Sequence, residues 1–311
     1  MSTLNSTQAK AGSVSELSAE AARVQAQSEE LRRAKRRRFI IKSILAHLVV
    51  LLFVIFAAFP IYFLITAALR PGQTLYSTNL QLIPSTISFD NFDYMINHTP
   101  LLKWLLNSII VASATTVLSV CLATTAAYAF SRWNFPGRNG IMSLLLALQA
   151  FPAILGLLAI FVIFKEFHML DTLWGLVLAY SAGGLIFAIW NTKGYFDTIP
   201  IELEESARVD GATPTQTFIQ VILPLARPVI AVTALLGFMA GWGEYITAQT
   251  VLFSENKYTS MVGLITLQTD YSKPWGWFAV GALLAMVPVM VVFMALQKNL
   301  VGGLTAGGVK G

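Results

Sequence analysis

Residues 195–228 read YFDTIPIELEESARVDGATPTQTFIQVILPLARP and separate two long apolar runs. This stretch decides how the chain is organised, because its composition differs sharply from that of its neighbours. It is acidic, and its five carboxylates belong to Asp197, Glu202, Glu204, Glu205 and Asp210. Its two basic residues are Arg208 and Arg227. Charged groups lose their hydration in hydrocarbon at a large free-energy cost, so we expect the whole stretch to lie in water.

The pattern predicts two short helices within this stretch. Pro200 suits the first turn of a helix, and three glutamates follow it near the positive end of the helix dipole. Asp210-Gly211 ends this helix, and Thr213 with Gln216 three residues later is typical of a capping box that starts the second. Leu223-Pro224 is expected to end the second helix. Each helix would be roughly 15 Å long, too short to span a bilayer. A helix-turn-helix between two membrane spans indicates a surface that a partner in the aqueous phase binds.

A spacing pattern within the stretch resembles a known family. Glu205-Ser206-Ala207, three further residues, Gly211, nine residues, and then Val221-Ile222-Leu223-Pro224 are similar to the EAA loop of binding-protein-dependent ABC importer permeases. The family has alanine where Ser206 stands and usually isoleucine where Val221 stands, and both changes are mild. Asp210-Gly211-Ala212 also fits the sugar-transporter branch. The alternative is a hairpin at the membrane surface that has no partner.

The resemblance implies a role for this loop in contact with an ATPase subunit. Glu205 would be the charged anchor for a basic residue of the ATPase, and Gly211 would permit the turn. Closure of an ATPase dimer would move the loop, and the attached spans would rock between inward-open and outward-open states. The coupling residues that the resemblance implies are Glu205, Ser206, Ala207, Asp210, Gly211, Ala212, Leu223 and Pro224.

Composition places the rest of the chain in a membrane. Of the 311 residues, 56% are hydrophobic and 12% are charged, whereas soluble domains carry about a quarter charged residues. The net charge of +5 is concentrated beside apolar runs, so membrane lipid and topology explain it better than nucleic acid does. The single cysteine, Cys121, excludes a disulfide within the chain.

The fold class expected is all-α, a polytopic membrane protein with six transmembrane helices. Each apolar run exceeds the about 20 residues that a spanning helix needs, and the only Asp, Glu, Lys or Arg within the six runs is Glu244. Pro60, Pro152 and Pro288 are expected to kink three of the helices. The runs are Ser43–Leu69, Trp104–Ser131, Asn139–Phe164, Thr172–Thr192, Pro228–Ser254 and Trp277–Gln297. The resemblance implies that they form the type I ABC importer permease fold.

Lys and Arg distribute unequally between the two sides of this topology. Six spans place both termini on one side, and 16 of the 21 Lys and Arg residues then share that side with residues 195–228, against five on the other. The positive-inside rule therefore predicts cytoplasmic termini and a cytoplasmic hairpin. The expected location is the cytoplasmic membrane of a prokaryote, crossed several times.

Three regions follow from this reading. Residues 1–38 form a polar, basic cytoplasmic tail, residues 39–298 form the six-span domain with the loop 195–228, and residues 299–311 form a glycine-rich tail. Composition alone favours disorder for that tail. Its sequence, however, is similar to the tail of the maltose-type permeases, which implies that Leu304, Thr305, Gly307 and Gly308 reach the interface between two ATPase subunits.

The substrate path has three candidate residues. Glu244 is the only ionisable acid within a span, and such a residue is by default a functional candidate. It could line a sugar path or hold a helix–helix hydrogen bond, and the sequence leaves both open. Asn107, at the head of the second span in a segment similar to the carbohydrate-uptake branch, and Gln149, beside the Pro152 kink, are the others. Gln149 and Asn191 more often indicate interhelical hydrogen bonds.

Enzymatic chemistry and cofactor binding have no support in the sequence. The phosphate-binding pattern GxxxxGK[ST] does not occur, so ATP and Mg²⁺ are expected on a separate ATPase. No pair of the three histidines, His47, His98 and His168, has a metal-ligand spacing, and we expect no metal and no catalytic residue.

The resemblance completes the hypothesis of one subunit of a binding-protein-dependent importer. Its partners would be a homologous second permease subunit, an ATPase dimer, membrane lipid and an external sugar-binding protein, which would meet residues 255–276. Maltose or a related oligosaccharide is the expected substrate. The alternatives are a permease for another sugar or a glycerol-phosphate-type substrate, a secondary transporter or channel, and a membrane-embedded enzyme.

Overall fold

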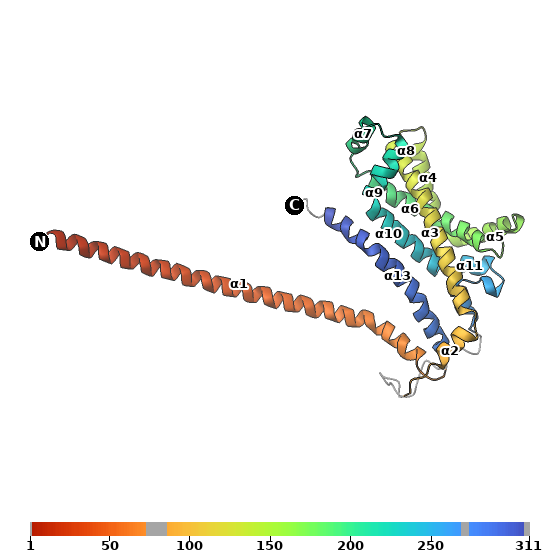
Figure 1. The fold of residues 1–311 in the computed structure, drawn as a ribbon, viewed down its shortest axis with the longest axis horizontal. Coiled ribbons are helices and arrows are strands. Elements are labelled where there is room, and N and C mark those ends of the chain that lie inside the picture. The colour runs from red at the N-terminus through yellow and green to blue at the C-terminus, as the bar shows by residue number, and fades with distance from the viewer. Residues whose placement is uncertain (1, 73–85, 269–273, 308–311) are drawn as a thin grey trace. The chain divides into compact units, whose positions relative to one another are not determined.

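The computed structural model describes the backbone of residues 2–72, 86–268 and 274–307, and the side chains of residues 35–72, 86–268 and 274–299. The regular elements of these ranges are helices (Figure 1). The longer ones are α1 (Ser2–Ala68), α2 (Asp90–Asn97), α3 (Leu101–Arg132), α4 (Arg138–Gln149), α5 (Leu157–Glu166), α6 (Leu173–Phe196), α7 (Glu202–Val209), α10 (Arg227–Gly243), α11 (Ile246–Val251), α12 (Ser260–Thr266) and α13 (Trp275–Gly307). The short turns between them are η1 (Ala153–Gly156), α8 (Pro214–Thr217), η2 (Phe218–Ile222), α9 (Leu223–Leu225) and η3 (Glu255–Lys257).

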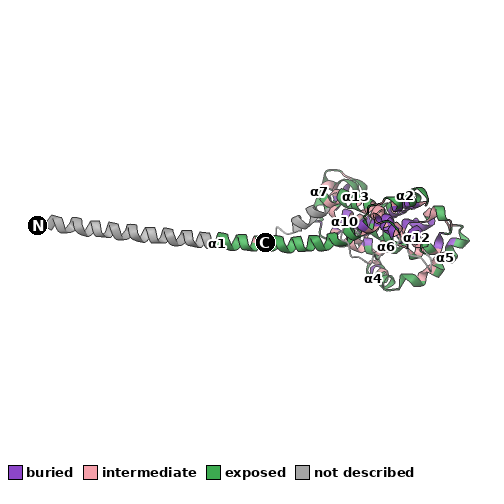
Figure 2. Cartoon of the chain, turned by 90° about the horizontal axis from the view of Figure 1, so that it is seen from below, coloured by how far each residue is buried: buried purple, intermediate pink, exposed green. Residues whose placement is uncertain are grey.

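The chain divides into two units, Met1–Phe63 and Leu64–Gly311. In the first unit, almost every described side chain of α1 is exposed, and from Phe39 onward these side chains are mostly apolar (Figure 2). A helix that is hydrophobic on every face suits lipid or another membrane helix rather than water. Pro60 lies inside α1, which continues past it.

Four helices of the described residues are long and apolar enough to cross a membrane: Lys35–Ala68, Leu101–Arg132, Leu173–Phe196 and Trp275–Asn299. Two bent helix pairs meet the same test, Arg138–Gln149 with Ala153–Glu166 and Pro214–Leu225 with Arg227–Gly243. If each bent pair is one span, six crossings result, in the order that the apolar runs predict. The second unit buries its core between its own helices (Figure 2).

The third span is not the single helix expected for Asn139–Phe164. The axes of its two halves differ by 93°, and the break lies at Ala150–Pro152. Pro152 has no backbone N–H and cannot continue the hydrogen-bond ladder of α4. The chain forms a 3-10 turn instead, in which Leu155 N donates to Pro152 O. The sequence located this irregularity but underestimated its size.

The fifth span also differs from the expected Pro228–Ser254 helix. α10 ends at Gly243, the backbone of Glu244 is extended, and a short separate helix, α11, follows from Ile246. The break therefore coincides with the only acidic residue of the apolar run.

Helix α3 is the central helix of the second unit. It packs along α6 and α10, and α10 packs in turn against α13. A small-residue contact brings α3 and α10 together, because a β-carbon on Gly241 would lie 3.5 Å from the Cα of Ala112. At the opposite end of α3 from residue 132, α12 lies against Trp104, which is buried in the core.

Candidate functional site

The segment 195–228 forms the predicted pair of short helices. Its first helix is α7, which begins at Glu202, two residues after Pro200. The helix ends in a Schellman motif, in which Ala212 N donates to Ala207 O and Gly211 N donates to Arg208 O. Gly211 has a φ of +87°, in the left-handed region that glycine adopts without strain. The expected turn at Asp210-Gly211 is confirmed.

The second helix starts as the capping box predicts but ends later. Gln216 N donates to Thr213 Oγ1 at 3.3 Å, and Thr213 N donates to Gln216 Oε1 at 2.8 Å. Leu223-Pro224 does not end the second helix, contrary to expectation. The helix widens into a π turn, in which Leu223 N donates to Phe218 O, and then continues to Leu225. The wider turn accommodates the proline that lacks an N–H. A bend of 76° then leads into α10.

Glu204 anchors α7 to the end of α3. Its side chain is 2% exposed, and Tyr128 Oη donates to its Oε2 at 2.8 Å. Arg132, the last residue of α3, donates from Nε to Glu204 Oε1 at 2.5 Å and from Nη2 to Ile199 O at 3.0 Å. The Arg132 guanidinium therefore binds both α7 and the connecting segment that precedes α7.

Sequence reasoning missed this role of Glu204. Its proposal that Glu205 anchors a basic residue of an ATPase concerns a different contact and stays a prediction. Glu205 is exposed, so it is free for a partner chain, whereas Glu204 is used within the subunit. Spacing alone does not separate two adjacent glutamates. The available signal was Arg132. A cation at the end of an apolar span is stabilised by a carboxylate at the same depth in the membrane, and Glu204 supplies it.

A second polar contact fixes the start of the segment. Asp197 accepts from Ser131 Oγ and from Lys193 Nζ, each at 2.6 Å. Burial alone would raise the pKa of the Asp197 carboxyl, but the hydrogen bonds from Lys193 and Ser131 outweigh it and lower the pKa. Tyr195 Oη also donates to Leu225 O at 3.3 Å. Below these contacts lies an apolar cluster of α3, α6 and α10 residues with Phe218 and Ile222.

The outer face of α7 carries apolar side chains beside charged ones. Val209 is 88% exposed, Ile201 56% and Leu203 43%, and Glu205, Ser206 and Asp210 are also exposed. Ala207, Ala212, Leu223 and Pro224 are half-buried. Exposed apolar side chains on a short, otherwise polar helix indicate a protein-binding surface. We call residues 201–210 with their exposed side chains the coupling face.

A different polar cluster holds the opposite end of the unit. Asp171, with a φ of 56°, accepts from Phe253 N, Ser254 N and Ser254 Oγ at 3.0, 2.9 and 2.5 Å, and from Lys257 Nζ at 3.0 Å. Its N–H donates to Val251 O. Burial alone would raise the pKa of Asp171, but the hydrogen bonds from Ser254, Phe253 and Lys257 hold it well below its usual range.

Asp171→Asn is expected to destabilise the purified chain by about 1.5–3 kcal/mol at pH 7, because charge-assisted hydrogen bonds are lost. A carboxyl whose folded pKa lies below its unfolded value stabilises the fold fully above about pH 4, and this contribution is lost as the pH falls through the folded pKa. In detergent between pH 3 and 7, the variant should unfold at a lower temperature than the unmodified chain. This difference in unfolding midpoint should narrow only at the acid end of the range. Asp93→Asn, at an exposed acid, is the control; equal destabilisation by both would contradict the assignment.

Asn107 uses its side-chain amide in this outer region. Its Nδ2 donates to Asn256 O and Tyr258 O, both at 3.0 Å, and Trp104 Nε1 donates to Glu255 O at 2.9 Å. The next residue of α3, Ser108, accepts from Ser260 N at 2.7 Å. The amide of Asn107 thus positions a loop, and its role in a substrate path stays a prediction.

Glu244 caps a helix within the broken fifth span. Its carboxylate accepts from Thr247 N at 2.9 Å, Thr247 Oγ1 at 3.0 Å and Ala248 N at 3.2 Å, so the N–H groups freed at the start of α11 satisfy the charge. Its backbone oxygen accepts from Tyr180 Oη at 3.3 Å. The side chain of Glu244 is half-buried. Among the other polar candidates, Gln149 is exposed beside the break in the third span. Asn191 makes the interhelical bond that was expected, to Thr233 Oγ1 at 2.9 Å.

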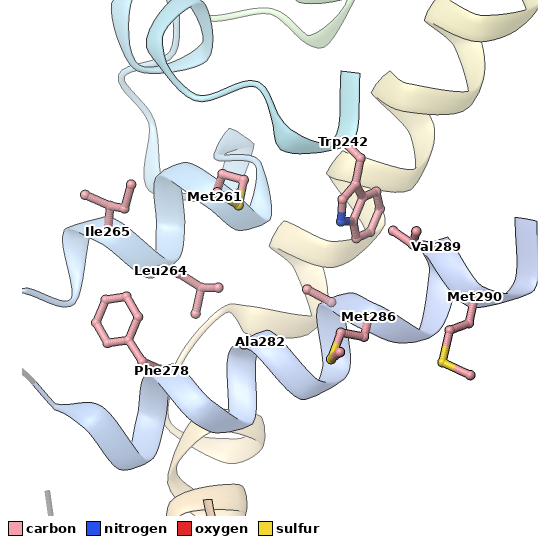
Figure 3. Close-up of a pocket in the computed structure, with 10 residues that line it drawn as sticks. Trp242, Met261, Leu264, Ile265, Phe278, Ala282, Met286, Val289 and Met290 are labelled. Atoms are coloured by element: carbon pink, nitrogen blue, oxygen red, sulfur yellow. The ribbon is translucent and has the colours of Figure 1, made fainter. Parts of the chain in front are cut away.

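An apolar groove lies between α10, α12 and α13 (Figure 3). It has a volume of about 490 Å³, and Trp242, Met261, Leu264 and Met286 are among its lining residues. Such a lining offers almost no hydrogen-bond partners for sugar hydroxyl groups, so we do not place a sugar there. In the described part of the chain, no group of three or more His, Cys, Asp and Glu side chains could hold a metal ion.

The predicted tail site lies largely beyond what the structure describes. The backbone of Leu304, Thr305 and Gly307 belongs to the end of α13. Their side chains, and Gly308 altogether, are outside the described residues.

Comparisons with known proteins agree with this architecture. The model of the family described as "Binding-protein-dependent transport system inner membrane component" matches residues 116–305. The chain is 37% identical over 281 residues to the galactooligosaccharides transport system permease protein GanQ of Bacillus subtilis (strain 168), covering 89% of this chain and 98% of that protein. It is 38% identical over 296 residues to the maltose/maltodextrin transport system permease protein MalG of Escherichia coli (strain K12), covering 89% and 97%.

Solved structures share the fold. A chain of a bacterial ABC transporter involved in the import of the acidic polysaccharide alginate has a TM-score of 0.70 at 22% identity, covering 83% of this chain and 96% of that one. A chain of the MetNI methionine ABC transporter, in an inward-facing conformation, has a TM-score of 0.51 at 16% identity, covering 70% and 99%. The expected all-α architecture of a type I ABC importer permease is therefore confirmed.

Proposed function

We propose that this chain, which belongs to the family of binding-protein-dependent transport system inner membrane components, is a permease subunit of an ATP-driven importer for maltose or a related oligosaccharide. It is a multi-pass membrane protein and a transport subunit rather than an enzyme. ATP and Mg²⁺ would be held by a separate ATPase dimer, and a homologous second permease would complete the translocation path. An external sugar-binding protein would deliver the substrate.

The coupling face of α7 is the observation that supports this function most strongly. It presents Glu205 and Val209 outward, while the buried Glu204 fastens the same helix to α3. A helix that is exposed on one side and anchored on the other can transmit force from a partner to the spans. Closure of the ATPase dimer would displace α7, and the attached α6 and α10 would move the path between inward-open and outward-open states.

The excess of Lys and Arg on one side supports an orientation with α7 and both termini in the cytoplasm. In a prokaryotic cytoplasmic membrane the ATPase would then meet α7 from inside. The tail residues Leu304, Thr305, Gly307 and Gly308 would reach the boundary between the two ATPase subunits. On the outer side, the loop fixed by Asp171 and Asn107 and the segment after it would face the binding protein.

The substrate class rests on two relatives whose names specify oligosaccharides. Glu244 and Gln149 are the polar groups of this chain that we place on the path, because breaks in two spans leave both side chains partly or wholly accessible. The alternatives are another sugar or a glycerol-phosphate-type substrate. In the other class of mechanism, a secondary transporter would need no ATPase.

The test is uptake of labelled sugar into liposomes that contain the complete complex purified from its native membrane. We expect maltose or maltodextrin uptake that requires ATP and the binding protein, with unlabelled galactooligosaccharide and glycerol 3-phosphate as competitors. If only galactooligosaccharide or only glycerol 3-phosphate competes with uptake, the substrate belongs to the class of that competitor instead. Uptake that persists without ATP would contradict the proposal and favour a secondary transporter.

A further inference from the structure

The ion pair between Glu204 and Arg132 is buried in the second unit. The side chains are 2% and 7% exposed, and Tyr128 Oη binds the second carboxylate oxygen at 2.8 Å. Arg208 lies 4.0 Å from the same carboxylate, but its side chain is 53% exposed. The three groups Glu204, Arg132 and Tyr128, which we call the Glu204 triad, therefore form one closed hydrogen-bonded unit below the coupling face.

Stability is a weak explanation for such a triad. Removing two charges from water costs about as much free energy as their mutual attraction returns, and apolar side chains of similar volume often serve a fold as well. A buried carboxylate that binds Arg132 with one oxygen and Tyr128 with the other instead fixes the distance and the angle between the elements that carry these groups. Here those elements are α7, the segment at Ile199 and the last turn of α3.

The covalent chain does not supply this connection. It joins α7 to α6 through residues 197–201 and to α10 through residues 210–226. Helix α3 lies far away in sequence, and its link to α7 runs through the Glu204 triad. Ser131, one residue before Arg132, adds a bond to Asp197 in the same layer.

Helix α3 can carry a displacement to the opposite end of the unit. It is continuous from Leu101 to Arg132, a length of about 48 Å at the rise of an α-helix. Near its other end, Trp104 and Asn107 hold Glu255, Asn256 and Tyr258 by their backbone oxygens. A single helix thus binds residues 197–204 at one end and the 252–259 loop at the other.

We propose that Glu204, Arg132 and Tyr128 are positioning residues that pass a displacement of α7 to α3, and through α3 to the 252–259 loop. This inference rests on the proposed function, because the displacement is supplied by a bound ATPase. It adds to that function a specific mechanical connection, made by side chains, which neither the exposed Glu205 nor the turn at Gly211 provides.

The experiment compares the reconstituted complex with Glu204→Gln, Arg132→Gln and the double variant. Glu166→Gln, at an exposed glutamate at the end of α5 and outside the coupling face, is the control. Three quantities are measured: the ATPase retained after purification, the rate of ATP hydrolysis, and the sugar transported per ATP hydrolysed. We expect each single variant to retain the ATPase and hydrolyse ATP, but to transport about tenfold less sugar per ATP. The double variant should be no worse than either single one, because both remove the same link.

Tyr128→Phe is a milder variant that tests the same triad if the Glu204 or Arg132 variants fail to fold. The ring stays in its apolar cluster and only one hydrogen bond is lost, so we expect a drop of about threefold in sugar per ATP. An unchanged ratio of sugar to ATP in all four variants would overturn the inference. Loss of the ATPase from the Glu204→Gln complex would also overturn it, since Glu204 would then only shape the docking surface. Failure of the unmodified chain to bind an ATPase would instead refute the proposed function itself.

Discussion

Val209→Asp is expected to reduce ATP-driven uptake by about 30-fold or more while leaving the chain folded. The side chain is 88% exposed at the end of α7, so it contributes little to the subunit's own core. In a complex it would enter an apolar contact of the ATPase, and a buried charge there costs at least about 2 kcal/mol at an interface hot spot. The measurement is sugar uptake by cells, corrected for the amount of chain in the membrane.

Graded variants test whether the coupling face is responsible. Val209→Ala removes apolar area without adding charge and should lower uptake only several-fold. Gly211→Pro should match the aspartate variant, because proline cannot adopt the φ of +87° that the turn requires. Uptake that is unaffected by Val209→Asp, in chains present at normal amounts, would contradict a docking role for α7.

Gly263→Ala is expected to cost about 1–3 kcal/mol of stability, through overpacking. A β-carbon at this position of α12 would overlap the indole ring of Trp104, which is itself held by Glu255 O and buried in the core. The thermal unfolding midpoint of the purified chain in detergent should fall by about 5 °C.

Gly184→Ala provides the matched control for this prediction. A β-carbon there has nothing within 4 Å, and alanine favours a helix over glycine by about 1 kcal/mol. The control should therefore unfold at the same temperature as the unmodified chain or slightly above it. If both variants shift the midpoint equally, the close packing of α12 on Trp104 is not what limits stability.

Much of the fold was accessible from the sequence, because apolar runs of membrane length and helix-capping residues are local signals. The capping box at Thr213 and the turn at Gly211 formed as expected. The size of the bend at Pro152 was not accessible, since a proline removes a hydrogen bond but does not set an angle. That angle depends on how neighbouring helices pack.

The local structure of the candidate site was predictable, but its contacts with other helices were not. The pair of short helices within residues 195–228 was predicted correctly, yet the inward contact of Glu204 depends on which face of α7 meets α3. Glu244 was singled out as the lone acid in a span, but sequence could not show that the helix breaks there and that α11 supplies the N–H groups. Both contacts lie between elements that are distant in sequence or irregular, and sequence patterns do not report them.

The most direct test of the account is a cross-link from the coupling face in native membranes. Cys121→Ser removes the single native cysteine, and Val209→Cys then carries a photoactivatable cross-linker; Asn97→Cys, exposed in α2, is the control. We predict that residue 209 links to an ATPase subunit and that residue 97 does not. If residue 209 reaches no ATPase, or if both positions reach it equally, the coupling face has been assigned to the wrong surface.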